Sequence, residues 1–124
     1  MTRARIAVVE DNPDNRLLLQ ALLTEEYDID EYEDGPAALD GIPRAVPDLI
    51  LLDVSLPGME GPEVLRRLKG MPGLDRIPTI ALTAHAMAGD RERLLAQGFD
   101  DYVAKPIVDE ELLYTAIRTL LRAR

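Results

Sequence analysis

The chain has 124 residues, of which 47% are apolar and 30% are charged, and its formal net charge is −9. This length suits one domain with its own core, and the negative charge argues against binding to nucleic acid or to an anionic membrane. The absence of cysteine excludes disulfides and a cysteine-based zinc site, and without a run of about 18 apolar residues or a signal peptide we expect a cytoplasmic protein.

Short β-rich runs alternate along the chain with segments of helical character. The β-rich runs predict strands over Arg5–Val9, Tyr27–Tyr32, Leu49–Asp53, Pro78–Thr83 and Tyr102–Ala104. Apolar spacing and Pro or Gly boundaries predict helices that begin at Pro13, cover Ala37–Ile42, run from Gly61 to Leu68, cover Asp90–Gln97, and start again at Asp109. The acidic side chains of the second run are typical of a strand at the edge of a sheet.

The run Leu49–Asp53 is the segment around which we expect the chain to be organised. Four apolar residues lead directly into one carboxylate, and a Pro/Gly-rich loop follows. An uninterrupted apolar run indicates a strand that is buried on both faces. Ligands of open parallel sheets bind beyond the carboxyl ends of the strands, which gives Asp53 a functional position. For an isolated Asp, a helix-capping role is the simpler reading, so the other strand ends have to decide.

The alternation of strands and helices indicates a fold class. It implies a parallel sheet with helices on both faces and right-handed crossovers. We therefore predict an α/β fold, with a doubly wound five-stranded parallel sheet flanked by five helices. No linker, repeat or low-complexity segment is visible, so we expect a single domain over residues 1–124.

Polar side chains stand at the ends of four of the predicted strands. They are Glu10, Asp11, Asp53, Thr83 and Lys105. Three clustered carboxylates repel one another, so the site should show a raised carboxyl pKa or bind a cation. An all-oxygen ligand set suits Mg²⁺, which often also coordinates a phosphate. The ammonium and the hydroxyl can bind phosphoryl oxygens, and a carboxylate beside them can attack phosphorus to give an aspartyl phosphate.

Four motifs, in register, resemble those of the receiver domains of two-component response regulators. They are Val9-Glu10-Asp11-Asn12, Leu52-Asp53-Val54-Ser55-Leu56-Pro57-Gly58-Met59-Glu60-Gly61, Ala81-Leu82-Thr83-Ala84 and Tyr102-Val103-Ala104-Lys105-Pro106. The resemblance covers essentially the whole chain. The segment Ala84-His85-Ala86-Met87-Ala88-Gly89-Asp90, which precedes the fourth predicted helix, resembles the receivers of hybrid histidine kinases and of stand-alone cell-cycle regulators. The resemblance of the whole chain implies a flavodoxin-like receiver fold with the strand order 2-1-3-4-5.

The resemblance also implies the chemistry of the site. Asp53 is expected to accept a phosphoryl group from the phosphohistidine of a sensor histidine kinase or a histidine phosphotransfer protein. The Mg²⁺ ligands that it implies are Glu10, Asp11, Asp53 and the backbone carbonyl of Ser55. The groups that it implies for the phosphoryl oxygens are Thr83, the backbone of Ala84, and Lys105. The bond between Lys105 and Pro106 is expected to be cis.

A conformational switch is part of the same implication. Tyr102 is expected to turn inward when Thr83 moves toward the phosphoryl group. The surface formed by the fourth helix, the fifth strand and the fifth helix would then change shape and engage a downstream protein target. His85 lies two residues after Thr83, where it either tunes the lifetime of the phosphoryl group or is a solvated loop residue.

Two alternatives belong to other functional classes. A Mg²⁺-dependent phosphohydrolase of the haloacid dehalogenase type would need a second acid two residues after the nucleophile, where this chain has Ser55. A pseudo-receiver that binds partners without phosphorylation is opposed by the complete set of acidic, hydroxyl and ammonium residues. We therefore expect a signalling switch that can dephosphorylate itself, not a turnover enzyme, and we expect it to be a stand-alone receiver.

Overall fold

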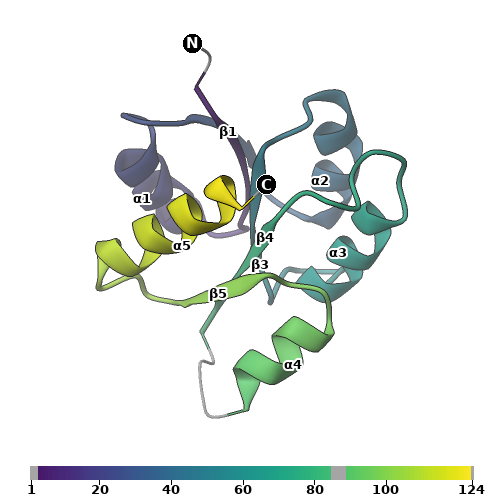
Figure 1. Ribbon diagram of the computed structural model, residues 1–124. Helices are drawn as coiled ribbons and strands as arrows, with labels where there is room; N and C mark the ends of the chain where they lie inside the picture. Colours follow the sequence, from purple (N-terminus) through teal and green to yellow (C-terminus); the bar gives the residue numbers. More distant parts are fainter. Residues whose placement is uncertain (1–2, 85–88, 124) are drawn as a thin grey trace.

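A central sheet is flanked by helices on both faces (Figure 1), in a computed structural model that describes residues 3–84 and 89–123. The strands are β1 (Arg5–Val9), β2 (Asp28–Tyr32), β3 (Leu49–Asp53), β4 (Thr79–Thr83) and β5 (Asp101–Ala104). The helices are α1 (Pro13–Leu23), α2 (Gly35–Gly41), the short 3-10 helix η1 (Ile42–Arg44), α3 (Gly61–Lys69), α4 (Asp90–Ala96) and α5 (Glu110–Arg122). Each strand and α-helix predicted from the sequence is present, which confirms the doubly wound α/β fold.

The strands are parallel and lie in the order β2-β1-β3-β4-β5, as the resemblance implied. Asp53 at the end of β3 pairs with Leu82, and Thr83 at the end of β4 pairs with Ala104. The ends of β1, β3, β4 and β5 therefore lie on one side of the sheet, which we call the carboxyl edge. This edge is where open parallel sheets bind their ligands.

Alternate residues of each strand enter two separate core layers. In β1, Ile6 and Val8 pack in the layer covered by α1 and α5, whereas Ala7 and Val9 pack in the layer covered by α2, α3 and α4. Figure 1 shows these two groups of helices on opposite faces of the sheet. All five residues of β3 are buried, because the central strand has helices on both of its faces.

The beginning of β2 differs slightly from what the periodicity suggested. The strand starts at Asp28, because the N–H of Tyr27 donates to the carbonyl of Leu23 (2.9 Å) and continues the turn that ends α1. The cap of α1 is Asn12, whose side chain accepts the N–H of Asp14 at 2.8 Å. The charged β2 lies at an edge of the sheet, as predicted.

The segment after β2 is also shifted from its predicted position. Helix α2 begins at Gly35, because the side chain of Asp34 accepts the N–H of Ala37 at 2.8 Å and so caps the first turn. The α-helix ends before Pro43, which has no N–H and whose ring is poorly accommodated inside a helix. The chain continues there as η1, which the sequence pattern did not indicate.

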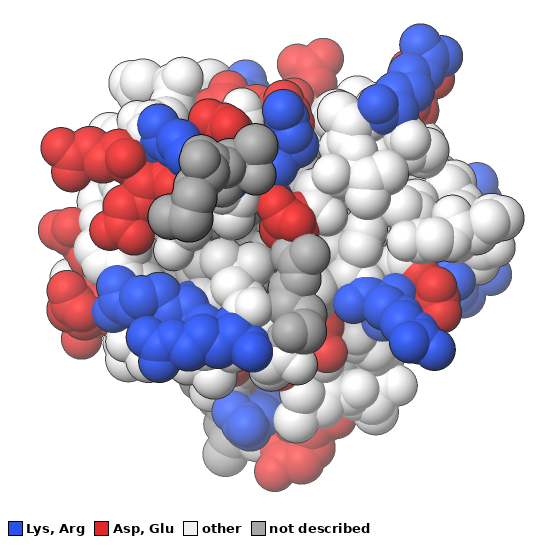
Figure 2. All heavy atoms as spheres, turned by 45° about the horizontal axis from the view of Figure 1, so that its top comes forward, with Lys and Arg blue, Asp and Glu red and all other residues white. Residues whose placement is uncertain are grey.

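The surface carries both signs of charge. Figure 2, in which the top of Figure 1 comes forward, shows separate groups of basic and acidic side chains on this face, with uncharged areas between them. The net charge of −9 is therefore not spread as a uniform negative field over this face. Within residues 3–84 and 89–123, none of the helices combines the length and the hydropathy needed to cross a membrane.

Candidate functional site

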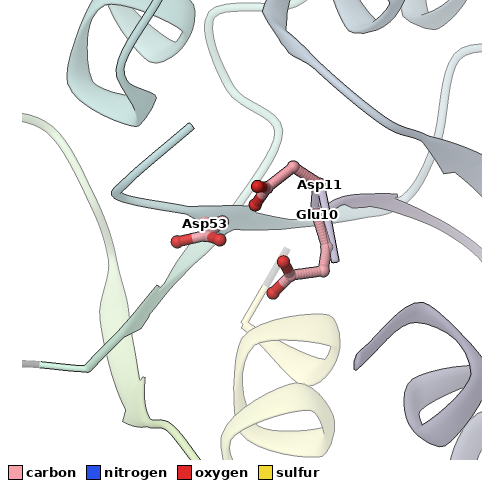
Figure 3. A group of neighbouring side chains, drawn as sticks. All are labelled: Glu10, Asp11 and Asp53. Atoms are coloured by element: carbon pink, nitrogen blue, oxygen red, sulfur yellow. The ribbon is translucent and has the colours of Figure 1, made fainter. Parts of the chain in front are cut away.

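Three carboxylates meet at the carboxyl edge. Glu10 and Asp11 directly follow β1, and Asp53 ends the neighbouring strand β3. One oxygen of each carboxylate lies within 4.8 Å of the others (Figure 3). Glu10 and Asp53 are buried, with 0% and 1% of their surface exposed, whereas Asp11 is open to solvent. The cluster predicted from the strand ends therefore exists, and it opens outward on the side of Asp11.

Both oxygens of the Asp53 carboxylate accept hydrogen bonds. The backbone N–H of Ser55 donates to Oδ1 at 2.9 Å, and Lys105 Nζ donates to Oδ2 at 2.8 Å. The loop after β3 turns back at once, because the N–H of Gly61 donates to the carbonyl of Val54 at 2.9 Å. A Cβ at Gly61 would lie 2.3 Å from the backbone oxygen of Asp53, so only glycine allows α3 to begin this close to the site.

Lys105 connects two of the three carboxylates. In addition to Asp53, its Nζ contacts Glu10 Oε1 at 3.1 Å, and 18% of the lysine side chain is exposed. Burial alone would lower the pKa of this ammonium, but the hydrogen bonds to Asp53 and Glu10 outweigh burial and leave its pKa raised. The peptide bond between Lys105 and Pro106 is cis. Lys105 is therefore a charged counter-ion for the buried carboxylates.

Glu10 is the most deeply buried member of the cluster. The N–H of Asn12 donates to its Oε2 at 3.0 Å, and the side chain of Asn15 donates to its Oε1 at 3.4 Å. Burial raises the pKa of Glu10, the bonds from Asn12 and Lys105 lower it, and the nearby charge of Asp53 raises it further; the net shift is upward. The raised carboxyl pKa expected for this site is thus found at Glu10.

The other residues that the sequence assigned to the site lie on β4, on β5 and after them. Thr83 is buried at the end of β4, and its carbonyl accepts the N–H of Lys105 at 2.7 Å. Ala84 follows it and is exposed. Tyr102 is half-buried and packs against the core layer of α2, α3 and α4. The expectation for His85 falls outside the residues that the structure describes.

Arg16 supports the site from α1 and was not found by the sequence analysis. Its Nη1 donates to the backbone carbonyl of Glu10 at 2.8 Å and to that of Asp11 at 3.0 Å. On its other side, its Nε lies 4.0 Å from Glu31 Oε1 on β2. The position of Arg16 in the first turns of a helix is unremarkable in the sequence, and only the turn between β1 and α1 brings it to these carbonyls.

The donor set of the cluster fits a hard divalent cation. It consists of carboxylate oxygens alone, one of them on an exposed residue that a hydrated ion can reach. Mg²⁺ prefers such oxygen ligands and retains several waters, so it needs few ligands from the protein. The ammonium of Lys105 already supplies positive charge to the two buried carboxylates. Glu10, Asp11 and Asp53 are thus the side chains that could hold Mg²⁺.

Known proteins match this chain along most of its length. The family model described as "Response regulator receiver domain" matches residues 6–118. The response regulator PleD of Caulobacter vibrioides is 45% identical over 120 residues, which cover 96% of this chain and 26% of PleD. The sensor protein GacS of Pseudomonas syringae is 38% identical over 118 residues, which cover 92% of this chain and 13% of GacS. The chain therefore spans about a quarter or less of these relatives.

A solved structure extends the similarity to three dimensions. The receiver domain of a sensor histidine kinase from Pseudomonas aeruginosa PAO1 superposes with a TM-score of 0.87 at 35% identity, covering 97% of this chain and 98% of that chain. That structure has a magnesium ion coordinated in its active-site cleft. This chain and that receiver domain therefore share the same fold. The magnesium ion is an observation on that receiver domain.

Proposed function

The chain belongs to the family of response regulator receiver domains, and from this membership we propose that it is a phosphorelay switch phosphorylated on Asp53. The donor would be the phosphohistidine of a sensor histidine kinase or of a histidine phosphotransfer protein. One observation supports this proposal above all others. The carboxylate of Asp53 ends the central strand within 4.8 Å of two further acids and 2.8 Å from the ammonium of Lys105.

The proposed transfer replaces one bond by another. A carboxylate oxygen of Asp53 forms a bond to phosphorus while the bond from phosphorus to the donor imidazole nitrogen breaks, and the imidazole keeps that electron pair. Glu10, Asp11, Asp53 and the carbonyl of Ser55 would hold Mg²⁺, whose charge would neutralise that of the transferred group. Lys105 would move from its two carboxylates to a phosphoryl oxygen, where its charge is needed most. Hydrolysis of the acyl phosphate would return the switch to its starting state.

The proposed output lies on the β4–β5 side of the site. Thr83 and the backbone of Ala84 would bind the remaining phosphoryl oxygens, and Tyr102 would move further inward. A cleft of about 440 Å³ already lies along β5 and α5, with Tyr102, Val103 and Leu112 in its walls. We propose that a downstream protein reads the surface of α4, β5 and α5, and that these events take place in the cytoplasm without nucleic acid or membrane as a partner.

Phosphorylation of purified protein tests the proposal directly. The protein is incubated with Mg²⁺ and a small acyl phosphate donor, and the intact mass is recorded before and after acid treatment. We expect an acid-labile phosphoryl adduct on the wild type and none on Asp53→Asn. Asp40→Asn, a matched change at an exposed Asp on α2, should be phosphorylated like the wild type. An undiminished adduct on Asp53→Asn, or none on the wild type, would contradict the proposal.

The proposed switch has its own readout. The chain contains no tryptophan, so Tyr102→Trp introduces a single tryptophan at the half-buried position on β5. We expect its emission to change when Mg²⁺ and the phosphate donor are both present, because the ring would move to a drier environment. Tyr27→Trp, at a buried position just before the edge strand β2, serves as a control that should not respond. Identical emission with and without phosphorylation would rule out movement of Tyr102.

A further inference from the structure

The two acids that follow β1 are arranged in a way that a continuing strand would not allow. Successive side chains of a strand point to opposite faces, and successive carbonyls point to opposite neighbours. Here the carboxylates of Glu10 and Asp11 both face Asp53 (Figure 3). Strand β1 ends at Val9, the N–H of Glu10 still donates to the carbonyl of Tyr32 at 3.0 Å, and the chain then bends at Asp11. Lys105 offsets the repulsion between the carboxylates of Glu10 and Asp53, but the backbone carbonyls of the bend still need donors of their own.

Arg16 provides these donors. One guanidinium nitrogen, Nη1, donates hydrogen bonds to both consecutive carbonyls, at 2.8 Å for Glu10 and 3.0 Å for Asp11. Both carbonyls therefore lie toward the same side of the bend, and the guanidinium holds them there. We propose that Arg16 is a positioning residue for the Mg²⁺ site. Its guanidinium clamps the β1–α1 bend, so that Glu10 and Asp11 present their oxygens together. This inference rests on the proposed function.

The clamp is anchored at both ends. The N–H of Arg16 donates to the carbonyl of Asn12 at 3.0 Å, which is the first hydrogen bond of α1, and Asn12 caps the same helix. Glu31 on β2 lies 4.0 Å from the guanidinium Nε and offers it a counter-charge, and only 20% of the arginine side chain is exposed. The clamp thus connects β1, α1 and β2, and it does not touch Asp53.

This arrangement predicts a specific effect on metal binding. Residues that orient metal ligands from behind typically change metal affinity by roughly 10–100-fold when they are removed. Arg16→Met keeps the aliphatic stem and removes every donor, so its Kd for Mg²⁺ should rise within that range. Arg16→Lys retains one nitrogen that can donate to a carbonyl but loses the forked guanidinium beside Glu31, so its Kd should lie between the wild type and Arg16→Met.

The test measures Mg²⁺ binding by isothermal titration calorimetry at a temperature at which circular dichroism shows each variant to be folded. Arg66→Met, at an exposed arginine on α3, is the matched control and should bind Mg²⁺ like the wild type. The rate of phosphorylation by the small donor is also followed against Mg²⁺ concentration. A positioning role predicts a higher half-saturating concentration and an unchanged rate at saturation, whereas loss of folded protein would lower the amplitude alone.

The outcomes separate this inference from the function on which it rests. A wild type that does not bind Mg²⁺ would overturn both. A wild type that binds, together with a folded Arg16→Met of equal Kd, would overturn the clamp and leave the proposed function intact. If Arg16→Met does not fold, Arg16→Lys decides, and an unchanged Kd in that variant would equally overturn the clamp.

Discussion

Two glutamates in different regions of this protein, one exposed and one buried, differ in the direction of their pKa shifts. Glu63 on α3 forms an exposed ion pair with Arg67 at 2.6 Å, and Glu10 at the carboxyl edge forms a buried one with Lys105 at 3.1 Å. Hydrogen bonds from Arg67 and Arg66 lower the pKa of Glu63, whereas burial raises the pKa of Glu10. The shorter contact is at the surface, yet burial is the main cause of the pKa shift only for the carboxylate of Glu10.

The comparison teaches where function resides in this chain. Exposed pairs such as Glu63–Arg67 contribute little to stability, because water already solvates both partners. A buried carboxylate costs free energy unless a partner compensates for its lost hydration. The carboxyl edge contains two such carboxylates, Glu10 and Asp53, which share one ammonium. Stability alone does not require this group, which supports the proposed binding of a cation and a phosphoryl group at this edge.

Removal of the shared ammonium should have the largest effect. Lys105→Met leaves both buried carboxylates without their counter-ion, and we expect the free energy of unfolding to fall by about 3 kcal/mol, at the lower end for a broken buried pair because the lysine is partly exposed. Added Mg²⁺ should recover part of the loss. Urea titration with and without Mg²⁺ measures both. Arg44→Met, in an exposed pair on α2 and η1, is the control; equal losses in the two variants would abolish the contrast between the regions.

Gly61 begins α3 next to the site, and Gly70 caps the other end of the same helix, so alanine at each position tests how closely α3 must approach the site. Gly61→Ala places a Cβ 2.3 Å from the carbonyl oxygen of Asp53, so the backbone must shift, at a cost of about 1–3 kcal/mol. Mg²⁺ binding should weaken with it, because Asp53 moves. Gly70→Ala meets nothing closer than 3.6 Å at a negative φ, and should be neutral or slightly stabilising. Urea midpoints and Mg²⁺ titrations that fail to separate the two variants would show that the approach of α3 is not constrained.

The pH dependence of stability should reveal the cost of burying Glu10. Its pKa is raised in the folded state above the reference value of 4.5, so the folded protein binds this proton more tightly than the unfolded chain. Stability is therefore lost as the pH rises from about 4.5 through the raised pKa. Glu10→Gln should gain stability relative to the wild type over this window, in the absence of Mg²⁺. Denaturation at several pH values measures it, and a constant difference between the two proteins would refute the assignment.

Glu63 should give the smallest effect, and one of opposite sign. Its pKa is lowered in the folded state, so its stabilisation is present above the reference value of 4.5 and is lost as the pH falls through the lowered pKa. Glu63→Gln should therefore lose a little stability relative to the wild type as the pH rises. Salt should reduce this difference, since exposed charges are screened. A loss as large as that of Lys105→Met would mean that burial does not distinguish the regions.

The sequence was sufficient for the order of elements and for most of the site. Alternating apolar runs and Pro or Gly boundaries identify strands and helices locally, and parallel strands necessarily bring their ends to one edge. Glu10, Asp11, Asp53 and Lys105 could be grouped on that ground before any coordinates, and the structure does bring them together. Their roles in phosphorylation remain predictions for the experiments above.

Other features required the folded chain, because they depend on individual hydrogen bonds and on ring geometry that the apolar pattern does not encode. The start of β2 after Tyr27 and the appearance of η1 follow from hydrogen bonds and a proline ring that periodicity does not register. Arg16 is one of two charged residues on α1, and it becomes a clamp only when the bend after β1 turns two carbonyls toward it. Apolar pattern thus determined the sheet and its functional edge, whereas packing and charge at that edge decided which side chains orient the acids.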